Sequence, residues 1–587
     1  MPGMPCFPSG PKSLEELIDW PTDFARRMAF HDAMHGGCCV SKLKGRMLGP
    51  GAVVTTTYSG IGCAETAASM CVEAVAGVSC DGVGDGITFF SACEKEEVQQ
   101  ECLKRGPHLH VFKDVMDRVP QVVAKTLMMM ASDAVQLFST DLKQVKSEPE
   151  DDCDVKAWVL EQKVKRGNKL LVDSLKMLDT VVMNDFAPCL KHPGQQCPLT
   201  PRAVPELANL LWVEVAGPVC KPWCSVGLKR QWLDITTPAC LTWVVSSRFF
   251  QPDAILLENS PFFVEGVVSD LLNGISLALM EDALSIVPKP IQPLQHATVI
   301  DSAQAALACS KRRRVSRKSR GTKFDAEKKY SCQPFQFCPS ALGFPIHRER
   351  KYVWYVWLGS WSLPTNMPLF SEIFFRHCEL PGSVYFDAIS PEVRALKTKG
   401  MPDAAKATSS LEPEGTESSC DDGSFALTAT CRARAATYLV KAQREGLVDM
   451  SGRWRRRACI VNLNWSSGYA GLPAHDMVPT LLQASKLYDL VKGTEFQAVE
   501  HFLIMGFPLA GSAGSERWAH AHKFSELVSL TCGSSLTGHQ ARAATPLSWA
   551  AGRVLSDREI RIVQGQGMHL GAVGAMLLLG LAYIEEL

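Results

Sequence analysis

Cys220 is the residue of this sequence whose setting best suits chemistry. A mostly apolar run at 210–215, broken only by Glu214, predicts a buried strand, and the chain must turn at Gly217-Pro218 directly before this cysteine. In an open α/β sheet, ligands bind where strands end, so a thiolate placed there could act as a nucleophile. The alternative is an inert core thiol. The chain holds 22 cysteines, and a buried cysteine is usually an unreactive core residue.

A second segment has the pattern of a cofactor site. The β-rich run 52–58 is followed by Ser59-Gly60-Ile61-Gly62-Cys63 and then by the helix-forming stretch 64–68. Strand, glycine turn and helix form a common binding arrangement for nucleotides. Glycines let the backbone approach a ligand, and the helix start offers free amide donors.

Two carboxylates follow the next predicted strands. Glu94 ends the run 86–93, where it could accept hydrogen bonds from ribose hydroxyls, and Asp114 follows a short strand at 108–112, where it could accept from an exocyclic amine such as adenine N6. Either one alone is more simply a solvated charge at a strand end. Their order after the glycine turn favours a nucleotide-type cofactor.

These segments and several later ones resemble the DNA (cytosine-5) methyltransferases, from about Val53 to the end of the chain. Eight matches occur in the family's order: Tyr58-Ser59-Gly60-Ile61-Gly62, Glu94, Lys113-Asp114-Val115, Gly217-Pro218-Val219-Cys220, Glu258-Asn259-Ser260, Arg348-Glu349-Arg350, Glu500 with Gly506-Phe507-Pro508, and Gly565-Gln566-Gly567-Met568. The resemblance implies an α/β fold with a Rossmann-like methyltransferase sheet, helices on both faces and an inserted target-recognition domain.

The resemblance also implies a reaction, in which a methyl group passes from S-adenosylmethionine to C5 of a cytosine flipped out of DNA. Cys220 would add to C6 of the base, Glu258 would hold N3, and Asn259 would brace the cysteine loop. Arg348 and Arg350 would contact the base. The cofactor would be held by Tyr58, Ser59, Gly60, Ile61, Gly62, Glu94, Asp114, Val115, Pro218, Gln566, Gly567 and Met568.

The sequence departs from the family pattern at a few positions beside these groups. The family's usual proline, glutamine, glutamine, glycine and asparagine are replaced by Val219, Lys221, Ile346, Cys63 and Gln566. No catalytic group is lost, and Cys224 occupies a position where the family has serine or threonine. Two alternatives stay open: a cytosine-5 methyltransferase of RNA, and a catalytically inactive DNA-binding or regulatory homologue.

The predicted organisation has four parts. Residues 1–50 form an N-terminal extension, and 51–358 form the cofactor-binding catalytic domain with inserts at about 133–168 and 297–340. Residues 359–493 form the target-recognition region with a disordered linker at 401–424, and 494–587 return to the catalytic domain.

Charge and composition bound the partners. The 61 Lys and Arg balance the 61 Asp and Glu, so any nucleic-acid surface must be a local patch. Lys311–Arg320, with seven cations in ten residues, suits nuclear import or phosphate binding, and Arg453-Trp454-Arg455-Arg456-Arg457 suits phosphate binding. Met1–Pro11 lacks the pattern of a signal peptide, so we expect an intracellular, nuclear protein. The apolar run 570–584 predicts a buried helix and no membrane span.

A metal site is not predicted. Cys189, His192 and Cys197 are metal-ligand types, but they offer three ligands at irregular spacing.

Overall fold

A computed structural model provides the architecture. It describes residues 8–49, 51–79, 86–145, 152–224, 230–274, 329–388, 427–449, 451–464, 472–473, 475–482, 485–497, 500–507, 565 and 567–587. Three sequence predictions lie outside these residues: the basic run 311–320, the linker 401–424 and the cofactor contact Gln566. Among the described residues, no helix is both long and apolar enough to cross a membrane.

A seven-stranded sheet forms the centre of the fold, in the order β3-β2-β1-β6-β7-β10-β8. The strands are β1 (Ala52–Thr57), β2 (Thr88–Cys93), β3 (His110–Phe112), β6 (Leu211–Ala216), β7 (Ala254–Asn259), β8 (Tyr330–Phe337) and β10 (Arg350–Trp357). β1 is parallel to β2 and β6 is parallel to β7, whereas β10 runs antiparallel to β7. Every residue of β1, β6 and β7 is buried, as apolar strands covered on both faces require. The predicted α/β class is confirmed.

The chain divides into two compact units. The first comprises residues 1–111, 336–350 and 365–583, and the second comprises 112–335, 351–364 and 584–587. The helices of the first unit are α1 (Leu14–Ile18), α2 (Trp20–His35), α3 (Cys39–Met47), α4 (Cys63–Ser79), α5 (Glu97–Arg105), α12 (Met367–Phe374), α14 (Ala429–Arg444), α15 (Glu500–Ile504) and α19 (Leu570–Tyr583).

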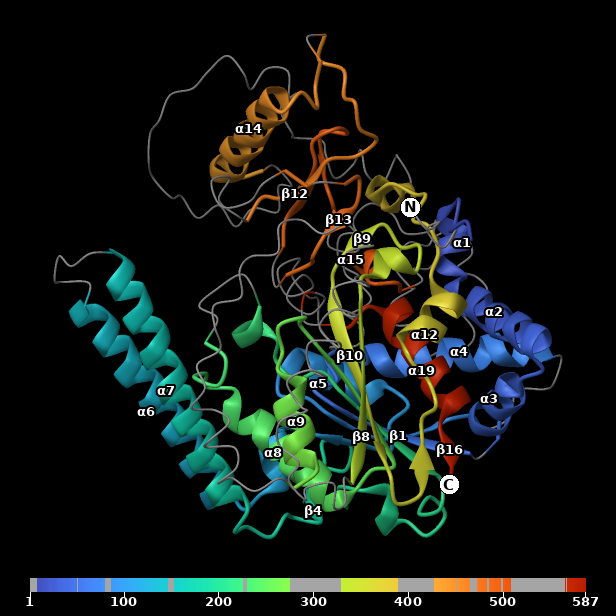
Figure 1. Ribbon diagram of the computed structural model, residues 1–587, viewed down its shortest axis with the longest axis vertical. Coiled ribbons are helices and arrows are strands. Elements are labelled where there is room, and N and C mark those ends of the chain that lie inside the picture. Colours follow the sequence, from blue (N-terminus) through green and yellow to red (C-terminus); the bar gives the residue numbers. More distant parts are fainter. Residues whose placement is uncertain are drawn as a thin grey trace, which may run out of the picture. The chain divides into compact units, whose positions relative to one another are not determined.

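The apolar helix α19 is the packing centre of the first unit. It lies against α4, α3 and α2, and all its residues but Tyr583 are buried (Figure 1). Two glycines allow this close packing: a Cβ on Gly574 would lie 2.3 Å from the Trp20 ring, and one on Gly571 would lie 2.4 Å from the Phe344 ring. The helix that begins at the glycine turn, α4, is therefore held by the last helix of the chain.

The predicted target-recognition region, called the recognition region below, has a small core of its own. Helix α14 packs on a three-stranded sheet of β12 (Ile460–Asn462), β14 (Leu487–Asp489) and β15 (Thr494–Glu495). Tyr438 of the helix meets Val461 and Tyr488 of the sheet in one buried cluster. A separate parallel pair joins β13 (Val478–Pro479) to β9 (Ile346–His347), directly before the arginine pair.

The second unit carries a long helical hairpin. Helices α6 (Gln121–Val145) and α7 (Asp152–Leu178) lie side by side, and both pack on α8 (Thr237–Phe250) (Figure 1). The predicted insert at 133–168 falls on this hairpin, so most of it is helix. The unit also holds α9 (Glu265–Leu272), a two-stranded hairpin of β4 (Phe186–Pro188) and β5 (Gln196–Pro198), and the pair β11 (Trp361–Ser362) with β16 (Glu585–Glu586). Strand β8 lies within the predicted insert 297–340.

The contact between α19 and α2 gives a first prediction. Gly574→Ala should destabilise the protein by about 1–3 kcal/mol, because the added methyl group meets the rigid Trp20 ring in a closed core. Gly77→Ala is the matched control: Gly77 is an exposed residue of α4 with open space at its Cβ, so alanine should be neutral or stabilise by up to about 1 kcal/mol. Denaturant unfolding of both variants measures the two effects, and equal changes would contradict this account of the packing.

Candidate functional site

The loop after β6 presents Cys220 at the end of a buried strand. Cys220 is half-buried and directly precedes the short 3-10 turn η3 (Lys221–Trp223). Trp223 anchors this turn, with its ring edge-to-face against Trp232 and Phe263 at centroid distances of 5.0 and 5.2 Å. The thiol is thus carried on a loop fixed by aromatic packing.

Asn259 ties the cysteine loop to the neighbouring strand. Its amide Nδ2 donates to the Pro218 carbonyl at 2.8 Å, while its Oδ1 accepts from the backbone N–H of Ser260. The side chain is fully buried, so both bonds are shielded from water. This is the contact that a residue bracing the loop needs.

Glu258 lies at the same edge of the sheet as the thiol loop. Ala216 pairs with Leu257 in the parallel register of β6 and β7, so Gly217 and Glu258 follow at neighbouring strand ends. Glu258 is 7% exposed. Parallel strands bring their carboxyl ends to one edge, which places a carboxylate beside the loop that carries the thiol.

Cys224 is engaged within the loop. Its thiol donates to the Cys220 carbonyl at 3.2 Å, in the manner of one helical turn. Val219 and Lys221 replace the proline and glutamine expected from the resemblance. Both are exposed, whereas Pro218 and Pro222 on either side are buried. The unusual neighbours of Cys220 therefore lie on the solvent side of the loop and leave its packing intact.

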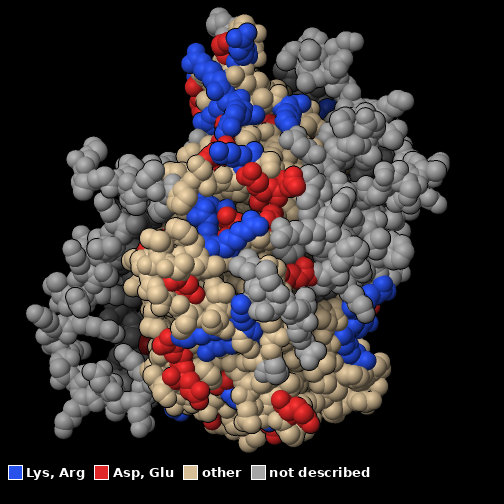
Figure 2. All heavy atoms as spheres, turned by 90° about the vertical axis from the view of Figure 1, so that its right-hand side faces the viewer, with Lys and Arg blue, Asp and Glu red and all other residues tan. Residues whose placement is uncertain are grey.

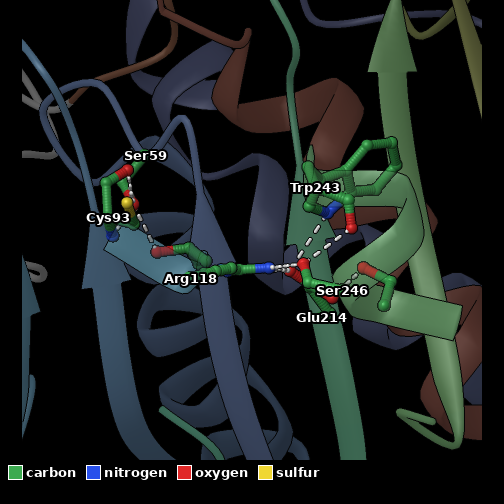
Figure 3. Close-up of polar contacts among 8 residues, drawn as sticks. Ser59, Cys93, Arg118, Glu214, Trp243 and Ser246 are labelled. Carbon is green, nitrogen blue, oxygen red and sulfur yellow. Dashed lines mark hydrogen bonds and ion pairs between the residues drawn. The ribbon is translucent and has the colours of Figure 1, made fainter. Parts of the chain in front are cut away.

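A buried acid in the strand before this loop was not singled out as a site residue from the sequence. Glu214 of β6 is 2% exposed and accepts hydrogen bonds from Trp243 Nε1 at 3.1 Å and Ser247 Oγ at 2.9 Å. Arg118 lies 3.4 Å from the same carboxylate and donates to Ser246 Oγ at 2.9 Å (Figure 3). The carboxylate therefore ties β6 to α8 and to Arg118. Its one sequence signal is a glutamate inside an apolar run.

The glycine turn after β1 has backbone angles that let a ligand approach the main chain closely. Tyr58, Gly60 and Gly62 all have positive φ angles, of 59°, 59° and 85°. A non-glycine residue in this region is strained, and such strain concentrates at functional sites. A Cβ on Gly60 would meet nothing within 4 Å, so open space faces this backbone. Ile61 is buried and anchors the turn.

Ser59 fastens this turn to the end of β2. Its backbone N–H donates to the Cys93 carbonyl at 3.1 Å, and its hydroxyl accepts from the Cys93 N–H at 3.1 Å (Figure 3). The hydroxyl also pairs with Thr56 Oγ1 at 2.7 Å. These bonds fix the turn directly beside Glu94.

Glu94 closes the glycine turn. Its Oε2 accepts from the Gly60 N–H at 2.8 Å, and its Oε1 accepts from the backbone of Lys95 and Glu96 at 2.8 and 3.2 Å. Withdrawal from water outweighs these donors and raises the pKa of Glu94 to about 7. A carboxylate has about four acceptor positions, so capacity remains for a hydroxyl of a ligand.

A second buried network supports the turn from below. Glu65 of α4 accepts from Thr56 Oγ1 at 2.5 Å, and its Oε1 lies 2.8 Å from His108 Nε2. Glu65 and His108 are each 2% exposed. This triad has no signal in the sequence, because its members lie on different elements and none belongs to a motif quoted above.

Asp114 and Val115 begin the 3-10 turn η1 (Val115–Arg118). Asp114 caps the turn by accepting from the Met116 N–H at 3.0 Å, and Val115 is buried. The cap fixes the carboxylate at the strand end where the sequence places it.

Both residues of the arginine pair, Arg348 and Arg350, are buried. Arg348 is 3% exposed and donates to the Leu481 carbonyl at 2.8 Å and to the Gly567 carbonyl at 2.7 Å. It thereby joins the last motif to the recognition region. Arg350 is also buried and donates to the Glu349 carbonyl at 2.9 Å. Ile346, in the position of the family's glutamine, is a buried residue of β9.

The last motif adjoins the Gly506-Phe507 turn. Leu570, the first residue of α19, donates its N–H to the Met505 carbonyl at 2.9 Å. Met568 and Gly567 are buried beside it. Burial, assisted by the positive charge of Arg348, lowers the pKa of His569 to about 3, so this imidazole is neutral at physiological pH.

Exposed cations gather on the predicted recognition region. The blue side chains at the upper end of Figure 2 lie where Figure 1 places α14 and β12. The exposed arginines of this region are Arg432, Arg444, Arg453, Arg455 and Arg457. Of the predicted basic run, Arg456 bonds to the Pro473 carbonyl and Arg457 to the Glu379 carbonyl, so these two also hold the local structure.

The structure adds a fourth residue to the three ligand-type residues noted in the sequence. Cys189, His192 and Cys197 are joined by a fourth ligand-type residue, His110, and the ligand atoms of all four lie within 4.8 Å of one another. The fourth residue lies far earlier in the chain, on β3, so spacing alone could not reveal it.

Comparisons with known proteins leave the family of this chain open. No family model matches, and no curated protein matches. Solved structures give distant matches: Entamoeba histolytica methyltransferase EhMeth (11% identity, TM-score 0.32, covering 90% of this chain and 98% of that one) and S. pombe Dnmt2 methyltransferase (11%, 0.32, 90% and 97%). A putative DNA modification methyltransferase of an E. coli prophage matches at 11% identity and a TM-score of 0.28, over 88% of this chain and 98% of that one.

The Asn259 contact predicts a loop-specific loss of stability. Asn259→Asp keeps the acceptor for Ser260 but replaces the donor to Pro218 with an oxygen, which should cost about 1–3 kcal/mol. Asn366→Asp is the matched control, because Asn366 only accepts, from the Leu369 N–H at the start of α12. Denaturant unfolding should separate the two variants. Equal stability would show that the bond to Pro218 contributes nothing.

Proposed function

We propose that this protein transfers a methyl group from S-adenosylmethionine to C5 of cytosine in DNA, through a covalent adduct at Cys220. The observation that carries the proposal is the paired strand ends of β6 and β7. One presents a thiol on an anchored loop, the other presents Glu258, and Asn259 bonds the two together. Methylation of cytosine at C5 needs a nucleophile and an acid that are held close together, as at these two strand ends.

The chemistry requires these two groups because C5 of cytosine is a weak nucleophile. Attack of the Cys220 thiolate on C6 forms a carbon–sulfur bond and moves an electron pair toward C5 and N3. Glu258 would act as the acid: its carboxylic acid O–H donates a hydrogen bond to N3 and passes the proton to N3 as negative charge develops there. C5 would then take the methyl group of the sulfonium, whose methyl–sulfur bond breaks and leaves the neutral thioether S-adenosylhomocysteine. Loss of the C5 proton to a base and departure of the thiolate from C6 restore the aromatic ring.

The glycine turn fits the cofactor. S-adenosylmethionine supplies the electrophilic methyl group, and its ribose hydroxyls match a carboxylate such as Glu94. The positive φ angles at 58, 60 and 62 and the open space at Gly60 leave room for a ligand close to the backbone. Asp114 would accept a hydrogen bond from the exocyclic amine of adenine. Pro218, Gly567 and Met568 complete the proposed contacts.

DNA is the proposed substrate because of the recognition region. Its exposed arginines offer sequence-independent phosphate contacts, and single cations of this kind position a duplex without reading its bases. A target base must also leave the stack to reach Cys220. RNA is the competing substrate and is an outcome of the experiment below.

Product analysis tests the proposed function. The full chain is incubated with S-adenosylmethionine and either duplex DNA or structured RNA, and the nucleosides are separated by mass spectrometry. We expect 5-methylcytosine in DNA, loss of at least about a thousandfold in rate for Cys220→Ser, and retention of activity in the matched variant Cys224→Ser. Methylation of RNA alone would replace DNA as the substrate. No methylation of either, by protein that still binds DNA, would support a catalytically inactive homologue.

The pKa of Glu94 predicts how cofactor binding depends on pH. The ionised carboxylate is the stronger acceptor for ribose hydroxyls, and its pKa of about 7 lies above the ordinary value of 4.5. Affinity for S-adenosylmethionine should therefore rise by about tenfold between about pH 6 and about pH 8, as Glu94 loses its proton. Calorimetric titration measures it. Glu94→Gln should bind more weakly with a flat profile, and an unchanged slope in this variant would exclude Glu94 as the titrating group.

A further inference from the structure

The hairpin of β4 and β5 brings two thiols and an imidazole to one point. Cys189 follows β4, and Cys197 lies in β5, where it pairs with Ala187. The turn between them is closed by a bond from the Cys189 N–H to the Gln195 carbonyl at 3.2 Å, with Gly194 at a φ of 79°. This turn directs His192 back toward both cysteines.

The distances within the group are those of a metal site. His192 Nδ1 lies 3.4 Å from the Cys189 sulfur and 3.4 Å from the Cys197 sulfur. A tetrahedral zinc ion, with bonds of about 2.3 Å to sulfur and about 2.0 Å to nitrogen, separates such ligands by about 3.6 Å. One ring nitrogen cannot serve two thiols well at once, whereas a shared cation accounts for the convergence of both.

His110 completes a four-ligand set. It begins β3, and Phe112 at the end of that strand forms an antiparallel bridge with Cys189. All four ligand atoms lie within 4.8 Å of one another. The two cysteines are 4% and 5% exposed, and the two histidines are half-buried. Two thiolates and two neutral imidazoles balance the charge of a divalent ion.

We propose that His110, Cys189, His192 and Cys197 bind a structural zinc ion. Two sulfur and two nitrogen ligands are typical of zinc, and four protein ligands leave no open position for a substrate or an activated water. The ion therefore has a structural role that is separate from methyl transfer.

The site would fasten the hairpin to the strand that leads into the proposed cofactor contacts. Asn184, just before β4, donates its N–H to the Arg118 carbonyl at 2.8 Å and its Nδ2 to the Asp117 carbonyl at 2.9 Å. Zinc would add a second fastening, at β3, directly before Lys113-Asp114-Val115. Removing it should loosen η1 and its cap Asp114.

Metal content tests the site directly. The full chain, produced with zinc present and then desalted, should hold about one zinc per molecule by plasma mass spectrometry, and Cys189→Ser and Cys197→Ser should each lose at least about nine-tenths of it. Cys102→Ala is the matched control, a buried thiol of α5 outside the group. The double variant His31→Ala/His35→Ala removes the other described group of metal-ligand types, which is more exposed, and should keep the zinc.

Measurements on the wild-type chain test the proposal even if the variants fail to fold. Replacement of zinc by cobalt should give the visible absorption of a tetrahedral ion with thiolate ligands, and a strong chelator should lower the melting temperature. The proposal is overturned if folded wild-type protein holds no zinc and takes up none from solution. It is equally overturned if Cys189 and Cys197 form a disulfide, or if the serine variants keep their zinc.

Discussion

The bond from Asn259 to the Pro218 carbonyl holds the loop of Cys220, the proposed nucleophile, against the next strand. A loop after a strand is free to move unless something outside it satisfies its backbone. Here the next strand supplies that partner, and it also carries Glu258. One buried hydrogen bond therefore fixes the relation between nucleophile and acid, which the proposed chemistry needs within a fraction of an ångström. The Trp223 cluster holds the other end of the loop.

Buried carboxylates likewise hold the glycine turn and the strand before the Cys220 loop in place through side-chain hydrogen bonds. Glu65 supports the glycine turn through Thr56, and Glu214 supports β6 through Arg118 and α8. Burying such groups is costly. The hydrogen bonds that they accept offset part of that cost and favour one backbone arrangement over its alternatives. The strain at Tyr58 persists because the bonds around Ser59 and Glu94 hold the turn closed.

The sequence predicted the strands that carry the site, because each is a short apolar or β-branched run followed by a turn residue. It also placed Cys220, Glu258 and Glu94 after those runs, at the ends of the strands. It could not show which side chains far apart in the sequence contact one another. Arg118 meets Glu214 from 96 positions away, and His108 meets Glu65 from 43. The Arg348 guanidinium bonds to backbone carbonyls, which leave no trace in residue type.

Trapping with a modified base tests most directly whether Cys220 is the nucleophile. DNA that contains 5-fluorocytosine cannot lose fluorine from C5, so the adduct between sulfur and C6 persists once methyl transfer has occurred. The full chain, incubated with this DNA and S-adenosylmethionine, should gain the mass of the oligonucleotide, and peptide mapping should place the bond at Cys220. A stable adduct at Cys224, or no adduct from protein that methylates ordinary DNA, would contradict the account.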